Sequence, residues 1–231
     1  MNSPRLVAEV FVIVGLALVV GCAPDADEQV AAIYDLKADP TPENVDRLRR
    51  LAANSDPRIR VTAIHALVQL NVPEASALAK EHLNDPDGFV RATAAKLVAD
   101  IGDPAHVPAL VERAREDPDK VVRQRAVEAL ERLGGEPAAA GLVDTLLDPA
   151  DNVRLAAVRA IRHLDPAAAV PELSRLLAED PNWEVRVQAA AALGESGHPE
   201  ARVALESARA DENEFVRGAV DKALRELDAG A

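Results

Sequence analysis

Residues 117–130 read Asp-Pro-Asp-Lys-Val-Val-Arg-Gln-Arg-Ala-Val-Glu-Ala-Leu, and the chain carries six versions of this pattern. Aligned on a Val-Arg or Ile-Arg pair, the six copies place their arginines at Arg60, Arg91, Arg123, Arg154, Arg186 and Arg217. The intervals between these arginines are 31, 32, 31, 32 and 31 residues. A period of this size indicates an array of short repeats, each packing mainly on its neighbours, and not a single globular core.

Each copy predicts two successive helices. First helices are expected over residues 57–70, 88–101, 120–133, 151–164, 183–195 and 214–228. Second helices are expected near residues 74–83, 105–116, 137–147, 167–179 and 199–209, each with a proline at or just before its start. A further helix pair within residues 28–54 lacks the signature and suits a terminal repeat that covers the open end of the stack. The sequence thus predicts thirteen helices, with residues 55–229 forming the regular repeats.

An apolar stripe runs along each first helix. The third residue after the arginine is Ala or Val, the seventh is Leu, Val or Ile, and the tenth is mostly Leu. Positions 3, 7 and 10 share one face of a helix, so this face is predicted to form the core. Positions 5 and 9 are mostly charged and are predicted to face water.

Two polar positions precede every arginine. The residue four before it is Asp, Asn or, once, Ala150, and it is placed to cap the first helix, with Asp151 as the substitute beside Ala150. The residue six before it is Asn54 in the first copy and an aspartate in the others, namely Asp85, Asp117, Asp148, Asp180 and Asp211. A loop carboxylate can accept hydrogen bonds from loop amides and from an arginine of its own or the adjoining repeat. We therefore expect a structural ladder of arginines and aspartates along one edge of the stack.

The composition limits the classes of partner. The net charge is −13 and the charges of both signs are interspersed, so the surface repels phosphate backbones and nucleic acid is not expected as a partner. Aromatic residues make up 2% of the chain, which predicts a small aliphatic core. The single cysteine excludes an internal disulfide and a cysteine-based zinc cluster.

Residues 1–21 are predicted to be a signal peptide outside the fold. Arg5 supplies a basic start, residues 6–20 are mostly apolar, and Val19-Val20-Gly21-Cys22 resembles a bacterial lipobox, whose cysteine is lipidated. Cys22 is the only cysteine, and residues 22–27 would tether the fold to the lipid. The alternative is an uncleaved anchor helix, but fifteen residues at about 1.5 Å each fall short of a hydrocarbon core of about 30 Å.

The pattern Asp-Pro-Asp-x-x-Val-Arg followed by Ala-x-x-x-Leu resembles the HEAT repeat, in the form called the phycobilisome-lyase HEAT-like repeat, over about residues 42–228. The resemblance implies an all-α, right-handed α-solenoid of about six helix-pair repeats. In that family the second helices line the concave face. There the position 21 residues after the arginine is held by Glu112, Asp144, Arg175 and Ser207, which we take as possible partner-binding residues.

Three enzymatic readings were weighed against a binding role. HEAT-repeat hydroxylases carry His-Glu pairs for iron, and this sequence has none, so no metal or other cofactor is expected. A HEAT-type DNA glycosylase needs a basic surface, and a bilin lyase needs a pigment groove in a cytoplasmic protein. Phe89, Trp183 and Phe215 all stand at the openings of first helices; we interpret them as packing against the preceding loops, with a binding anchor as the alternative.

The sequence therefore favours a noncatalytic scaffold or assembly factor, lipid-anchored to the inner or outer membrane of a bacterial cell envelope. Its expected partner is another protein, with no small-molecule substrate. The alternatives are a lyase-like or chaperone-like accessory subunit of an enzyme complex, including one with bilin-lyase activity, and a structural spacer.

Overall fold

The computed structural model describes residues 25–229, and its contacts divide the chain into two units that meet between Val72 and Pro73. Within the described residues the regular structure consists of thirteen α-helices and five short 3-10 helices, with no strand. The predicted signal peptide, Cys22 and the first part of the tether lie outside the described residues.

The first unit contains three described helices, α2 (Ala26–Ala38), α3 (Pro42–Leu51) and α4 (Pro57–Gln69), each in contact with the other two. Side-chain oxygens start all three, because Asp25, Thr41 and Asp56 accept from the amides of the first turns of α2, α3 and α4. The helix α4 is the first to carry the Val-Arg or Ile-Arg signature. It therefore packs in one unit with the helix pair that was expected to close the stack.

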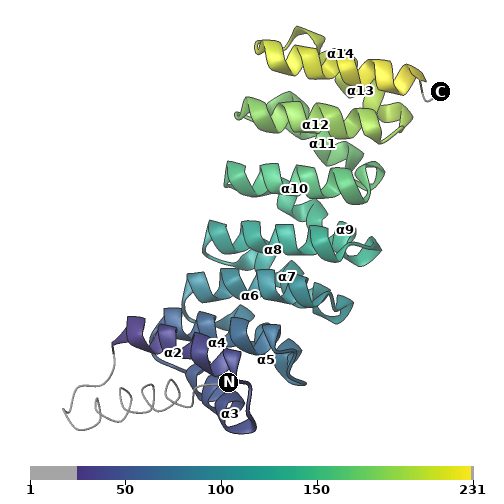
Figure 1. Ribbon diagram of the computed structural model, residues 1–231. Helices are drawn as coiled ribbons and strands as arrows, with labels where there is room; N and C mark the ends of the chain where they lie inside the picture. The colour runs from purple at the N-terminus through teal and green to yellow at the C-terminus, as the bar shows by residue number, and fades with distance from the viewer. Residues whose placement is uncertain (1–24, 230–231) are drawn as a thin grey trace, which may run out of the picture. The chain divides into compact units, whose positions relative to one another are not determined.

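The second unit is a two-layer stack (Figure 1). Its first layer consists of α6 (Gly88–Ile101), α8 (Lys120–Leu133), α10 (Asp151–Leu164), α12 (Trp183–Glu195) and α14 (Glu214–Ala229). Each of these helices contacts the next, and shorter helices form the second layer behind them (Figure 1). All first helices, α4 included, start at the predicted residue, and their ends lie within one residue of the prediction.

The first helices are buried over a wider face than the sequence predicted. Positions 3 and 7 after each arginine are buried, but position 10 is only half-buried throughout, so its assignment to the core was wrong. The residue before each arginine and the sixth residue after it are also buried, for example Val122 and Ala129 in α8. The reason is that α8 contacts α6 and α10 in its own layer and α7 and α9 behind it, so a single stripe cannot cover all its contacts.

The second layer is less regular than the first. It consists of α5 (Ala75–Glu81) with η1 (His82–Asn84), η2 (Pro104–His106) with α7 (Val107–Glu116), α9 (Glu136–Leu142) with η3 (Val143–Leu147), η4 (Pro166–Ala169) with α11 (Val170–Glu179), and α13 (Pro199–Ser207) with η5 (Ala208–Ala210). Each helix predicted as continuous is therefore an α-helix joined to a 3-10 turn. In α7 and α11 a proline follows the first residue, and because it has no amide to donate, the α-helix does not extend backwards into η2 or η4.

The alternation between 31 and 32 residues has a structural cause in the last turn of the second layer. Before the 31-residue steps end, the amide of the loop aspartate donates to the carbonyl three residues earlier, as Asp148 does to Thr145. In the 32-residue steps it donates to the carbonyl four residues earlier, as Asp180 does to Leu176. A closing turn of the 3-10 type uses one residue fewer than an α turn, and every aspartate reaches an equivalent place.

Candidate functional site

The edge of the second unit where the first helices begin carries the arginines and aspartates. In one rung, Nε and Nη2 of Arg154 donate to the two carboxylate oxygens of Asp180 in the next repeat, at 2.6 and 2.9 Å. Nη1 of Arg154 donates to the carbonyl of Asp148 in its own loop at 2.9 Å. The carboxylate of Asp180 also accepts from the amide of Asn182 at 2.8 Å. One guanidinium thus joins two consecutive loops.

The same rung recurs through the second unit. Its other members are Arg91 with Asp117, Arg123 with Asp148, and Arg186 with Asp211, joined at distances of 2.6–3.0 Å. In every case the carboxylate belongs to the adjoining repeat and the accepting carbonyl to the arginine's own repeat. The sequence had left open which of the two repeats supplies the carboxylate.

The two terminal arginines make the carbonyl contacts as well. Nη1 of Arg60 donates to the carbonyl of Asn54 at 2.9 Å, and Nη1 of Arg217 donates to that of Asp211 at 2.7 Å. Arg217 begins the last described helix, α14, and its side chain is exposed. The side chain of Asp85 accepts from the amide of Asp87 at 2.9 Å.

The rungs are buried and ionised. Burial raises the pKa of Asp117, but hydrogen bonds from Arg91 and the Asp119 amide and the positive charges of Arg91 and Arg113 outweigh it and hold this pKa below its usual value. The hydrogen bond to Asp180 raises the pKa of Arg154 despite desolvation. Bidentate arginine–carboxylate pairs of this kind combine charge with fixed geometry, so the ladder sets the spacing of the repeats.

Loop side chains also start the first helices. The caps Asp56, Asp87, Asp119, Asn182 and Asn213 accept from amides of the first turns at 2.8–3.4 Å. Ala150 makes no such bond, and the side chain of Asp151 accepts from the Asn152 amide at 2.8 Å in its place. Caps and rungs together use the repeated polar residues of this edge.

The four predicted partner-binding residues, which we call the second-helix surface, lie in the second layer. Glu112 is in α7, Asp144 in η3, Arg175 in α11 and Ser207 in α13, and all four are exposed. Glu112 pairs with Arg113, Asp144 lies 2.8 Å from Arg115 of α7, and Arg175 lies 3.1 Å from Glu179. The surface is polar and mixed in charge, and its side chains do not converge on one point.

The packing interpretation of the aromatic residues fails for Phe89 and Phe215, which are each 60% exposed. Trp183 is 39% exposed and its ring lies 5.3 Å from that of Phe215. The alternative, a binding anchor, therefore remains the interpretation to pursue.

A contact between Ser76 and His106 was not foreseen. Ser76 Oγ lies 2.7 Å from Nε2 of the buried His106, and Asp103 lies 3.9 Å from the same nitrogen. Nδ1 of His106 is buried and has no hydrogen-bond partner among the described residues. A nucleophile–base pair needs a third group on the far ring nitrogen to orient the imidazole, and here that nitrogen has none.

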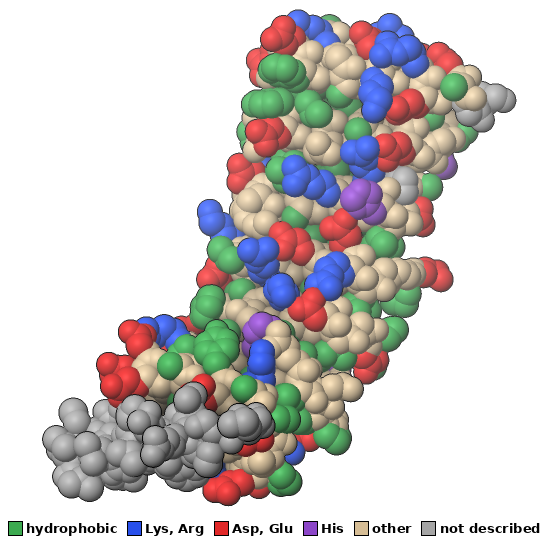
Figure 2. All heavy atoms as spheres, viewed as in Figure 1, with side chains coloured by type: hydrophobic (Ala, Val, Ile, Leu, Met, Phe, Trp, Pro, Cys, Tyr) green, Lys and Arg blue, Asp and Glu red, His purple; other side chains and the backbone are tan. Residues whose placement is uncertain are grey.

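Other chemical groups are sparse in the described part of the chain. Between residues 25 and 229 no three His, Cys, Asp or Glu side chains are arranged to hold a metal ion. No helix in this range is long and apolar enough to cross a membrane. Figure 2 shows acidic and basic side chains interspersed over the first helices of the second unit, without a large patch of one sign.

The comparison with protein families agrees with this geometry. Residues 16–92, 78–154 and 139–225 each match HEAT repeats. The chain belongs to the HEAT-repeat family. Three overlapping matches span almost all of the described residues of this HEAT-repeat protein, so the whole repeat array is covered.

Individual relatives extend the comparison. The protein is 32% identical to a phycobilisome maturation protein of Synechococcus elongatus, over 77% of this chain and 76% of that protein. Its fold is similar to the crystal structure of YibA from Escherichia coli, with a TM-score of 0.59 and 23% identity over 90% of this chain and 80% of YibA. A designed armadillo repeat protein in complex with the peptide (KR)4 is similar at a TM-score of 0.54 and 20% identity, over 85% and 98% of the two chains.

Proposed function

We propose that this HEAT-repeat protein is a noncatalytic accessory factor that binds another protein and assists its maturation or assembly. The observation that carries the proposal is its similarity, over three quarters of both chains, to a protein named for phycobilisome maturation. Stacked repeats expose a long surface for their length, which suits them to holding a partner over many contacts.

The chemistry of the described residues supports binding over catalysis. The repeated arginines and aspartates are engaged with one another in the ladder, so they are not free to act as acids or bases. The side chains that differ from repeat to repeat lie exposed on the second-helix surface. A partner would meet these variable residues, and we assign the binding role to Glu112, Asp144, Arg175 and Ser207.

We further propose that the protein is anchored by lipid at Cys22 to a membrane of the bacterial cell envelope. The support is the lipobox-like sequence Val19-Val20-Gly21-Cys22 and the position of the only cysteine there. Two or more acyl chains on one cysteine would give stable attachment, at about 0.8 kcal/mol per buried CH₂, where a single chain would be marginal.

The anchor is tested by Cys22→Ser in the native host. The variant should leave the membrane fraction or accumulate as unprocessed precursor, whereas the wild type should yield an N-terminal peptide with diacylglycerol on Cys22 by mass spectrometry. Mature wild-type protein that begins at Ala23 or later without lipid would refute the anchor, as would an intact N-terminus.

The binding role is tested by crosslinking in the native envelope followed by purification and mass spectrometry. We expect one protein to be captured repeatedly, without copurifying pigment or metal. Bound bilin or turnover of a substrate would support the lyase-like alternative instead, and reproducible absence of any captured protein would leave the structural spacer.

A further inference from the structure

The aromatic residues of this chain are on its surface. The described residues include four aromatic side chains, with exposed fractions of 59% for Tyr34, 60% for Phe89, 39% for Trp183 and 60% for Phe215. The buried hydrophobic residues in this range are all Ala, Val, Leu or Ile. Aromatic residues that do not build the core, and that remain exposed, are typical of binding surfaces.

Two of these rings form a pair across adjacent repeats. Trp183 begins α12 and Phe215 lies in the first turn of α14; their ring centroids are 5.3 Å apart and their planes are tilted by 31°. Both stand at the edge that carries the arginine–aspartate ladder. The pair therefore offers a continuous aromatic surface that spans two repeats.

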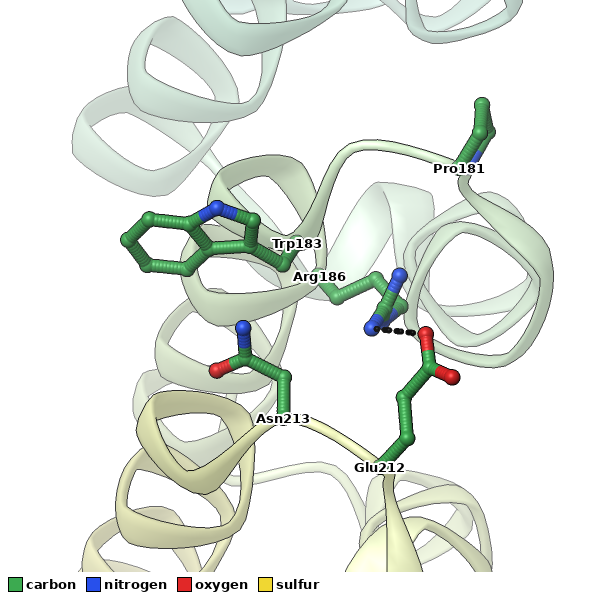
Figure 3. A pocket seen from close by; sticks show the side chains of 5 residues that line it. All are labelled: Pro181, Trp183, Arg186, Glu212 and Asn213. Atoms are coloured by element: carbon green, nitrogen blue, oxygen red, sulfur yellow. Dashed lines mark hydrogen bonds and ion pairs between the residues drawn. The ribbon is translucent and has the colours of Figure 1, made fainter.

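A shallow groove, which we call the α12–α14 groove, lies beside this pair. It is lined by Pro181, Trp183, Arg186, Glu212 and Asn213. Figure 3 shows the indole of Trp183 and the amide of Asn213 on one side and the Arg186–Glu212 ion pair on the other, with open space between them. A second hollow, lined in part by Pro149, Asp151 and Asn182, shares Pro181 and Trp183 with the groove and continues it along the same edge.

The groove carries a surplus of negative charge. The guanidinium of Arg186 is already matched by the bidentate carboxylate of Asp211, at 3.0 Å on both sides. Glu212 lies farther from Arg186, at 3.4 Å, and its side chain is 89% exposed, so its charge is not neutralised. Residues 180–186 and 211–217 together hold five carboxylates and two arginines.

The positive ends of the two helices do not reverse this balance. Asn182 and Asn213 cap α12 and α14 by accepting from the amides of Glu184 and Phe215, at 2.9 and 2.8 Å. Glu184 and Glu214 also place carboxylates in the first turns, where they offset the helix dipoles. An anion would therefore find the amides occupied and carboxylates nearby.

We propose that the α12–α14 groove binds a lysine or arginine side chain from an extended segment of a partner protein. The aliphatic stem and cationic group would lie against the Trp183–Phe215 pair, and the cation would face Glu212. The inference rests on the proposed function in assuming a protein partner, but it adds a site distinct from the second-helix surface and a preference for positive charge.

Trp183 is the only tryptophan of the chain, so its fluorescence reports directly on this groove. The full chain, purified in detergent, is titrated with three octapeptides that alternate serine with lysine, glutamine or glutamate. We expect a saturable change in emission with the lysine peptide alone, weakened by added salt because the attraction is between exposed charges. Glu212→Gln and Phe215→Ala should each weaken this binding roughly five-fold, the contribution expected of one exposed ionic or cation–π contact.

Phe89→Ala is the matched control, because Phe89 occupies the same repeat position as Phe215 and is equally exposed but lies outside the pair. It should leave the titration unchanged. Equal binding of the glutamate peptide, the absence of any saturable change, or lysine-peptide binding that is insensitive to both groove variants would overturn the inference. If crosslinking captures a partner while the lysine peptide fails, only the groove is refuted; if the peptide binds but no protein is captured, the proposed function fails and the groove stands.

Discussion

The ladder edge and the second-helix surface of the second unit use charged residues in opposite ways. On the ladder edge one residue type recurs in each copy, and the side chains of a rung such as Arg154 and Asp180 are only 11% and 1% exposed. On the second-helix surface one repeat position holds Glu112, Asp144, Arg175 and Ser207, and all four are exposed. Repetition therefore identifies the contacts that build the stack, and variation identifies the residues left for a partner.

The largest effect should follow the loss of an interior rung. Arg154→Ala leaves the carboxylate of Asp180 buried without its cation, which should lower the free energy of unfolding by about 3 kcal/mol. Urea unfolding followed by circular dichroism measures this change. Arg217→Ala is the control, because Arg217 is exposed and its described hydrogen bonds are to the carbonyls of Asp211 and Glu212, and it should cost less than about 1 kcal/mol. Equal losses at the two arginines would contradict the difference between interior and terminal rungs.

A smaller loss should follow crowding between two first helices. A Cβ added at Gly194 of α12 would stand 2.7 Å from the Cα of Ala223 in α14, so Gly194→Ala must push these helices apart. We expect it to cost about 1–3 kcal/mol. Gly218→Ala, in α14 with open space around it, should instead be neutral or stabilise by about 0.5–1 kcal/mol, because alanine favours helix. If both substitutions destabilise alike, close packing of α12 on α14 is not the cause.

Acid should weaken the ladder selectively. The pKa of Asp117 and that of Asp211 are below their usual values, since hydrogen bonds and the charges of their arginines outweigh the raising effect of burial. A carboxyl whose folded pKa is lowered stabilises the fold above its unfolded pKa of about 4 and loses that contribution as the pH falls through the folded pKa. The free energy of unfolding should therefore fall below about pH 4, and less steeply in Asp211→Asn. An unchanged slope in that variant would show that this rung does not contribute to acid stability.

The sequence predicted the regular features of the fold because they are written once per repeat. The first helices start where the caps and the Val-Arg pairs place them, and the arginines meet the loop aspartates from one repeat to the next. The interruption of the second helices was missed, since it depends on whether the turn before Asp148 or Asp180 closes over three or four residues. The Trp183–Phe215 pair was missed because the two residues stand 32 positions apart and occupy different places in their repeats.

The most direct test of the central claim compares partner capture by two charge-reversed variants. Glu112→Lys with Asp144→Lys alters the second-helix surface, where the side chains are 55% and 61% exposed and each pairs with one arginine. Asp221→Lys with Asp228→Lys is the matched control on α14, with exposures of 55% and 64% and one arginine partner each. Glu195 is unsuitable as a control, because both of its carboxylate oxygens accept hydrogen bonds from Arg162.

Crosslinked capture from the native envelope is measured for both variants together with their unfolding midpoints. The account predicts that both double variants keep a midpoint near that of the wild type, and that only Glu112→Lys with Asp144→Lys loses the captured protein. Equal capture by the two variants would contradict the assignment of partner binding to the second-helix surface.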